Sequence, residues 1–333
     1  MCVTVAIKLP RDRDTGEPTK DAKWTLFKIR DRAYDPHYHF KTYNDGKNTS
    51  LFLVDEDSDW SECIRVDNIK TETELMFINS ALNNSMDKKD GTDKSKAAET
   101  ATGKRKVADH GLIARRVSRT ADLDDAVKTF SEMKFDGCTF ISDGDRCFLV
   151  ESSLPSDAKS EIKKRAKADG SYGAGSLRSQ ATSEDFVTTT EEIKDWLAVR
   201  TNHGITNKVA GYQIKDGISF ESSENRRNFA DAYIRDNVFE VSDILPAIDA
   251  MGDKTVNKNP FLRPRRIRRE IEDWNANKNR SEENKVPLIY STSAFVMTAG
   301  GNVHIKLYDA GISKVNIQKL YSKDFPIKVS INR

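Results

Sequence analysis

The residue whose type and position best suit it to catalysis is Cys2, the second residue of the chain. Methionine aminopeptidases remove Met1 when a small residue follows, and Cys2 would then carry both a thiol and a free α-amine. An α-amine titrates at about 7.7 to 8.0 and a thiol at about 8.5, so near neutral pH the amine can accept the thiol proton. This pattern would suit an N-terminal nucleophile whose base belongs to the same residue, although many proteins carry a cysteine at position two without such a role.

Charged residues at the end of the second predicted strand can supply the electrostatics that such a nucleophile needs. Lys28 and Asp31 lie in the segment 27–36, which an antiparallel hairpin brings back beside the start of the chain. A carboxylate there can orient the ammonium or the thiol, and a cation there favours the thiolate. The same charges would also suit surface salt bridges at a hydrated strand end.

Three further segments carry polar side chains at positions where the end of a buried strand or the start of a helix does not require them. They are Asn79 after residues 75–78, the run Thr201-Asn202-His203-Gly204, and Ser222-Ser223 with Arg226. An asparagine amide can donate to an oxyanion, although closing a turn is its commoner use. The two serines also fit a helix N-cap, and His203, with no nucleophile motif nearby, is most simply a structural residue.

Taken together, these elements resemble the N-terminal-nucleophile cysteine hydrolases of the choloylglycine hydrolase and penicillin V acylase type, with the related acyltransferases that process penicillin precursors. The matching elements, in an order and approximate spacing that agree over residues 2–226, are Met1-Cys2, Lys28 with Asp31, Phe77-Ile78-Asn79, Thr201-Asn202-His203 and Ser222-Ser223-Glu224-Asn225-Arg226. The resemblance implies a four-layer αββα fold, two antiparallel sheets between helix layers. It implies the catalytic residues Cys2, Lys28, Asp31, Asn79, Asn202 and Arg226.

The resemblance further implies hydrolysis of a linear carboxamide through an acyl-enzyme, with a small-molecule amide as substrate and no cofactor or metal. The thiolate attacks the carbonyl carbon, and the α-amine passes the proton to the leaving amine. Asn202 and Asn79 are expected to stabilise the oxyanion. Asp31 is expected to orient the amine, and Arg226 and Lys28 to hold the carboxylate and thiolate charges.

One position departs from the family, because Lys28 stands where its members carry arginine. Lysine keeps the charge but lacks the planar fork of a guanidinium. With a shifted register, Arg32 and Asp35 would form the pair instead; Lys28 is preferred because it follows the strand directly. A glutamine amidotransferase-like enzyme is an alternative, although Val3 replaces the glycine expected after its cysteine. An acyltransferase on the same fold, or a binding or structural protein without turnover, also stays open.

Strands and helices are predicted along the whole chain, which indicates a mixed α+β protein. Strand patterns occupy residues 2–8, 24–30, 50–54, 75–78, 138–142, 146–151, 288–295 and 303–307, and helical periodicity occupies 122–135, 184–197, 225–239 and 267–275. Residues 84–106 contain few apolar side chains and are predicted to be a disordered insertion. The rest is expected to form a single domain, 1–333.

Composition narrows the classes of partner. The chain has 333 residues with 54 Lys and Arg against 52 Asp and Glu, a net charge of +2, so it lacks the basic surplus of a general nucleic-acid binder. The basic run 263–269 is interpreted as a solvated helix start, with a contact to nucleic acid or to an acidic protein as its alternative. Association with further copies of the chain stays open.

Membrane and metal roles are not expected. No apolar run reaches the roughly 18 residues of a membrane helix, and the start of the chain lacks the pattern of a secretory signal, so a cytoplasmic location is expected. The cysteines Cys2, Cys63, Cys138 and Cys147 form no CxxC pair, which indicates reduced thiols. His37 and His39 have no matching Cys or Glu cluster for a metal.

Overall fold

The computed structural model describes most of the predicted strands and the residues around Cys2. The described residues are 2–32, 38–44, 46–55, 60–68, 74–81, 116–117, 119–120, 122–132, 135, 137–153, 155, 158–169, 182–205, 218–252, 255–256, 259–260, 290–299, 303–308 and 327–331. The predicted insertion at 84–106, the helix at 267–275, the basic run 263–269, Asp35 and His37 lie outside them, as do the side chains of Arg32, His39 and Cys63.

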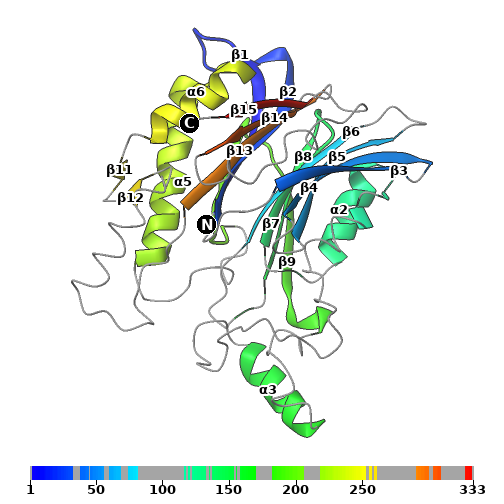
Figure 1. Ribbon diagram of the computed structural model, residues 1–333. Helices are drawn as coiled ribbons and strands as arrows, with labels where there is room; N and C mark the ends of the chain where they lie inside the picture. Colours follow the sequence, from blue (N-terminus) through cyan, green and yellow to red (C-terminus); the bar gives the residue numbers. More distant parts are fainter. Residues whose placement is uncertain are drawn as a thin grey trace.

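Six strands form a first sheet, called sheet A (Figure 1). In spatial order they are β10 (Leu197–Arg200), β1 (Val3–Arg11), β2 (Pro18–Arg32), β13 (Tyr290–Thr298), β14 (Val303–Leu307) and β15 (Ile327–Ile331). The predicted hairpin is confirmed, because β1 and β2 pair antiparallel with Val3 opposite Ile29. The expectation of purely antiparallel sheets needs one correction, since β14 and β15 pair in parallel.

Seven strands form a second sheet, called sheet B, in which all neighbours are antiparallel. In spatial order they are β3 (Tyr38–Asn44), β4 (Asn48–Asp55), β5 (Trp60–Asn68), β6 (Glu74–Ala81), β7 (Gly137–Ser142), β8 (Cys147–Ser153) and β9 (Val187–Glu192). The turn between β7 and β8 needs Gly144, whose φ is 94°. A Cβ there would lie 2.8 Å from the Cβ of Ala299, which directly follows β13.

The apolar side chains form three clusters that follow from strand alternation. One cluster joins sheet A to sheet B, with Leu26 from β2 and Ile78 from β6 among its members. A second lies between sheet A and the helices α5 (Ile218–Asn237) and α6 (Val241–Gly252). A third lies between sheet B and α2 (Leu123–Glu132). The helices accordingly flank the two sheets on opposite sides in Figure 1.

The remaining elements are short or lie apart from these clusters. They are α3 (Ala158–Ala168), the 3-10 turn η2 (Ser183–Asp185), and the strand pair β11 (Thr255–Val256) and β12 (Asn259–Pro260). In Figure 1, α3 projects away from both sheets. No helix within the described residues combines the length and the apolar character needed to cross a bilayer.

Two helix predictions are wrong in part. Residues 184–197 were expected to be helical, but they form η2, β9 and the start of β10. The β-branched threonines at 188–190 favour a strand, and pairing with β8 decides between the two patterns. Helix α5 begins at Ile218 rather than at 225, so the two serines at 222–223 lie inside it and do not cap its start.

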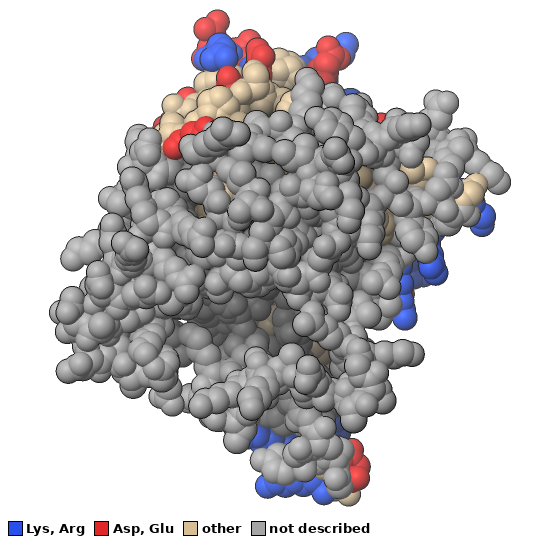
Figure 2. Space-filling view, in the orientation of Figure 1, with Lys and Arg blue, Asp and Glu red and all other residues tan. Residues whose placement is uncertain are grey.

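Charged side chains of both signs are mixed on the described surface. In Figure 2, Lys and Arg lie beside Asp and Glu at the upper and the lower end of the face shown. This mixture agrees with the near-zero net charge of the sequence.

Candidate active site around Cys2

Cys2 directly precedes β1, an interior strand of sheet A, and only 6% of its surface is exposed. Its main-chain nitrogen donates a hydrogen bond to Asn202 Oδ1 at 2.8 Å. In the intact chain this atom is the amide nitrogen of the Met1–Cys2 bond, and cleavage of that bond turns it into an α-amine. The structure therefore brings two predicted site residues together across 200 positions of sequence.

The turn that carries Asn202 is held by side chains from two other elements. Ser80 of β6 donates from Oγ to the carbonyl oxygen of Thr201 at 2.8 Å. Ser223 of α5 accepts from the main-chain N–H of Asn202 at 3.1 Å. Both serines are almost fully buried, so these bonds are shielded from competing water.

Glu151, which the sequence reasoning missed, clamps the same turn from sheet B. It is fully buried and accepts from Arg200 Nε at 3.2 Å. Its second oxygen accepts from the main-chain N–H of Ile205 at 3.1 Å. The two donors stand on either side of Asn202, so one carboxylate anchors both ends of the turn. A lone glutamate within the apolar strand at 147–153 was the available signal, because a carboxylate is seldom fully buried without a partner.

His203 takes a structural position in a buried hydrogen-bond network with Thr201 and Ser223. Its Nδ1 lies 2.9 Å from Ser223 Oγ. The Ser223 hydroxyl donates to Thr201 Oγ1, and the Thr201 hydroxyl donates to the Ser223 carbonyl, each at 2.9 Å. A proton on Nδ1 satisfies all these contacts. Burial, followed by the positive charges of Arg227 and Arg200, lowers the pKa of His203 to about 4.

We expect this histidine to make the protein sensitive to mild acid. Its pKa is lowered from 6.5 to about 4 on folding, so the unfolded state binds more protons in that interval. Stability from neutral His203 is therefore complete above about pH 6.5 and is lost as the pH falls toward 4. By pH 5 we expect the wild type to lose about 2 kcal/mol more than His203→Asn, which keeps a donor near Nδ1. Urea unfolding of both proteins at pH 7.5 and pH 5 measures this difference, and equal losses would contradict it.

Lys28 and Asn79 form a second pair of predicted site residues. Lys28 Nζ donates to Asn79 Oδ1 at 3.2 Å and lies 5.7 Å from the ring centroid of Phe295. Lys28 is almost fully buried on β2. With Oδ1 directed at the ammonium, Nδ2 is the end of the Asn79 amide that can donate to an oxyanion.

Strand alternation places a second buried cation on the same face as Lys28. Phe27 and Ile29 pack toward the helices, so Lys28 and Arg30 turn toward sheet B. Arg30 is fully buried, and continuing the pairing of β1 with β2 by one residue sets it opposite Cys2. Sequence reasoning had not selected Arg30.

Ser293 of β13 is a further residue on this face. It pairs with Arg30 in the ladder and is fully buried. Its hydroxyl has no hydrogen-bond partner among the described residues. A buried hydroxyl in that condition is available to a bound water or a substrate.

Asp31 and Arg226 form the third pair. Arg226 NH1 of α5 lies 2.9 Å from Asp31 Oδ2, and both side chains are at most 1% exposed. Ser291 donates to Asp31 Oδ1 at 2.7 Å. This serine reaches the helix-facing side because the ladder between β2 and β13 is irregular between Ser291 and Ser293, and an extra residue switches the face of those beyond it.

The six predicted site residues therefore form three pairs: Cys2 with Asn202, Lys28 with Asn79, and Asp31 with Arg226. Five of the six are almost fully buried, and Asn79 is half-buried. Comparison with models of known protein families gives no match for this chain, and no curated protein sequence matches it. The chemistry of the site accordingly follows from its own side chains.

Proposed function

We propose that the protein is an N-terminal-nucleophile cysteine amidohydrolase with the four-layer αββα arrangement. Three apolar clusters support that arrangement, since one joins the sheets and the others join each sheet to helices. The contact between the Cys2 nitrogen and Asn202 Oδ1 is the observation that carries the function. It gives the nitrogen a buried acceptor suited to an amine that must keep one orientation.

The proposed reaction begins once the Met1–Cys2 bond has been cleaved. The α-amine accepts the thiol proton, and the thiolate attacks the carbonyl carbon of a linear amide. The tetrahedral intermediate collapses as the resulting ammonium donates its proton to the leaving nitrogen. Water, activated by the same amine, then hydrolyses the thioester and regenerates the thiol.

In this proposal the three pairs orient the amine, stabilise the oxyanion and supply the charges of the site. Asn202 holds the amine through Oδ1, and its Nδ2 together with Nδ2 of Asn79 donates to the oxyanion. Lys28 orients Asn79 and adds positive charge on the inter-sheet face. Asp31, held by Arg226, provides the negative charge that stabilises the ammonium form of the amine.

An amine can replace water as the acceptor of the acyl group. Acyl transfer would use the same nucleophile, the same oxyanion donors and the same thioester. The nature of the acceptor therefore distinguishes an amidohydrolase from an acyltransferase on this site.

Intact-mass spectrometry of the purified protein tests the proposal. We expect a chain that lacks Met1 and that gains one acyl group from p-nitrophenyl acetate, with the acetyl group on Cys2. Neutral hydroxylamine should remove the group, since it cleaves thioesters readily. Retention of Met1 in active material would rule out the amine as base, and acetylation confined to lysines would rule out Cys2 as the nucleophile.

A further inference from the structure

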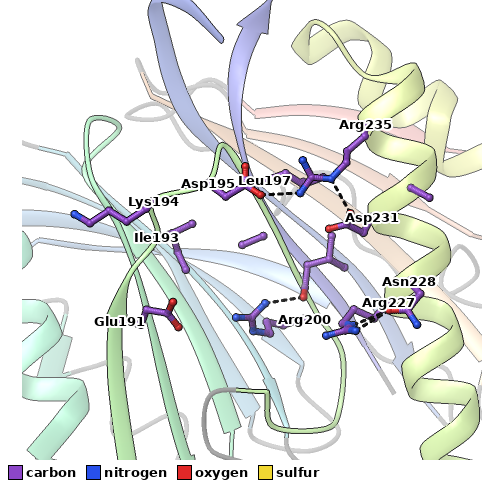
Figure 3. Close-up of a pocket in the computed structure, with 13 residues that line it drawn as sticks. Glu191, Ile193, Lys194, Asp195, Leu197, Arg200, Arg227, Asn228, Asp231 and Arg235 are labelled. Carbon is purple, nitrogen blue, oxygen red and sulfur yellow. Dashed lines mark hydrogen bonds and ion pairs between the residues drawn. The ribbon is translucent and has the colours of Figure 1, made fainter. Parts of the chain in front are cut away.

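A polar pocket of about 490 Å³ lies beside the proposed active site, between β10 and α5 (Figure 3). We call it the β10 groove. Its lining comes from the end of β9, from the connection between β9 and β10, from the whole of β10 and from one side of α5. The residues used below are Leu197, Val199, Arg200, Arg227, Asn228 and Arg235.

Among the described residues, the groove follows the edge of sheet A that β10 forms. β10 is the outermost strand of that sheet, and all of its residues, 197–200, line the groove. Successive side chains of a strand point to opposite faces. A pocket that touches four consecutive residues must therefore run along the main chain at the strand edge.

The hydrogen-bond pattern shows which main-chain groups face the groove. The Lys8 N–H donates to the Trp196 carbonyl at 2.8 Å, and bonded pairs alternate along an antiparallel ladder. The main-chain groups of Leu197 and Val199 consequently turn away from β1. Arg200 NH1 bonds the Val199 carbonyl at 3.0 Å on this outer side, which agrees with that assignment. The N–H and C=O of Leu197 and the N–H of Val199 are thus presented to the groove.

The two ends of the groove differ in charge. At the far end Arg235 is neutralised by Asp231 and Asp195, each at 2.8 Å. At the near end Arg227 donates from Nε and NH2 to the neutral amide of Asn228. Within the described residues no carboxylate pairs with Arg227. The near end therefore presents a cation suited to an anionic group.

The near end adjoins the site. Arg200 is opposite Thr4 in the ladder, two residues from Cys2, and Arg227 directly follows Arg226. Both arginines lower the pKa of His203, whose network holds the Asn202 turn. A ligand in the groove would consequently have one end near the turn that carries Asn202.

We infer that the β10 groove binds an extended, peptide-like segment of the substrate. The segment adds to β10 as a further strand, in the manner of β-strand addition, and places a carboxylate at Arg227. The inference rests on the proposed function only in naming this ligand as a substrate. Three residues of extended chain span about 10 Å, which is close to the length of the four-residue strand β10.

Calorimetric titration of the Cys2→Ala variant with N-acetyl-trialanine tests binding without turnover. We expect binding of the free acid to weaken about tenfold or more when its carboxylate is replaced by an amide, or when Arg227→Gln is added to the protein. N-methylation of the central peptide bond should weaken it similarly, because it removes a donor to the strand edge. Arg13→Gln is the matched control, since Arg13 is exposed and pairs with Asp243 away from the groove, and it should leave affinity unchanged.

Absence of binding at millimolar peptide, or affinity indifferent to all three changes, would overturn the inference. The outcome is separable from that of the proposed function. If Arg227→Gln hydrolyses amides at an unaltered rate and the peptide does not inhibit it, the amidohydrolase proposal stands and peptide binding in the β10 groove is contradicted. If the protein retains Met1 and forms no acyl-enzyme but binds the peptide with the expected pattern, peptide binding in the β10 groove stands and the amidohydrolase proposal is contradicted.

Discussion

Cys2→Ala is expected to lower amide hydrolysis by at least about 10³-fold, because it removes the only group that forms the covalent intermediate. The fold should persist, since losing one buried sulfur costs about 1 kcal/mol. Cys2→Ser should be similarly inactive while matching the size of the side chain more closely. Turnover of an amide substrate and the urea midpoint, measured on the same preparation, give the two quantities.

Two other cysteines provide the controls for this experiment. Cys138 and Cys147 are fully buried, and burial raises the pKa of Cys138 to about 11 and that of Cys147 well above its usual value. Both should therefore remain protonated thiols that react slowly with iodoacetamide at neutral pH. Cys147→Ala should keep the rate per folded molecule, whereas Cys2→Ala should remove the fast-labelling site. Turnover in Cys2→Ala, or fast labelling at Cys138 or Cys147, would count against the assignment.

Arg226→Met is expected to destabilise the protein by about 3 to 5 kcal/mol. The substitution leaves the Asp31 carboxylate buried without the guanidinium that lies 2.9 Å from it, and an uncompensated buried charge is costly. The Asp31→Asn, Arg226→Met double variant should regain part of that loss, because it removes both charges. Urea unfolding of the two single variants and the double variant gives the coupling between the residues.

The exposed pair of Arg13 and Asp243 is the matched comparison. Its atoms are 3.5 Å apart and the Arg13 side chain is 64% exposed, so Arg13→Met should cost less than about 1 kcal/mol. A similarly small cost for Arg226→Met would show that Asp31 does not depend on this partner. That result would also contradict the proposed role of Asp31 and Arg226 in stabilising the α-amine of Cys2.

The alternation of apolar and polar residues was sufficient to predict the central strands of sheet A. Residues 2–8 and 24–30 alternate, and they pair as β1 and β2. The spacing of three between Lys28 and Asp31 also has a direct consequence, because an odd spacing on a strand puts the two side chains on opposite faces. The structure has Lys28 at the inter-sheet contact with Asn79 and Asp31 at the helix-facing contact with Arg226.

Hydrophobic periodicity gave the wrong secondary structure where helical and strand spacing both fit the same short segment. Apolar residues in 184–197 recur at helical spacing, yet the segment forms β9, the edge strand of sheet B, and the first residue of β10. Strand β5, at 60–68, was not predicted either, because its polar residues conceal the alternation. In both cases hydrogen bonding to a neighbouring strand outweighs a weak local preference.

The sequence by itself therefore determined which residue types are available for the chemistry and on which strand faces several of them lie. Only the tertiary structure decided how they are paired. Asn202 meets Cys2 across 200 residues, Glu151 meets Arg200 through the contact of two sheets, and an irregular ladder turns Ser291 toward Asp31. The physical reason is that side-chain direction follows from local backbone geometry, whereas a buried charge or amide finds its partner only when distant strands and helices pack together.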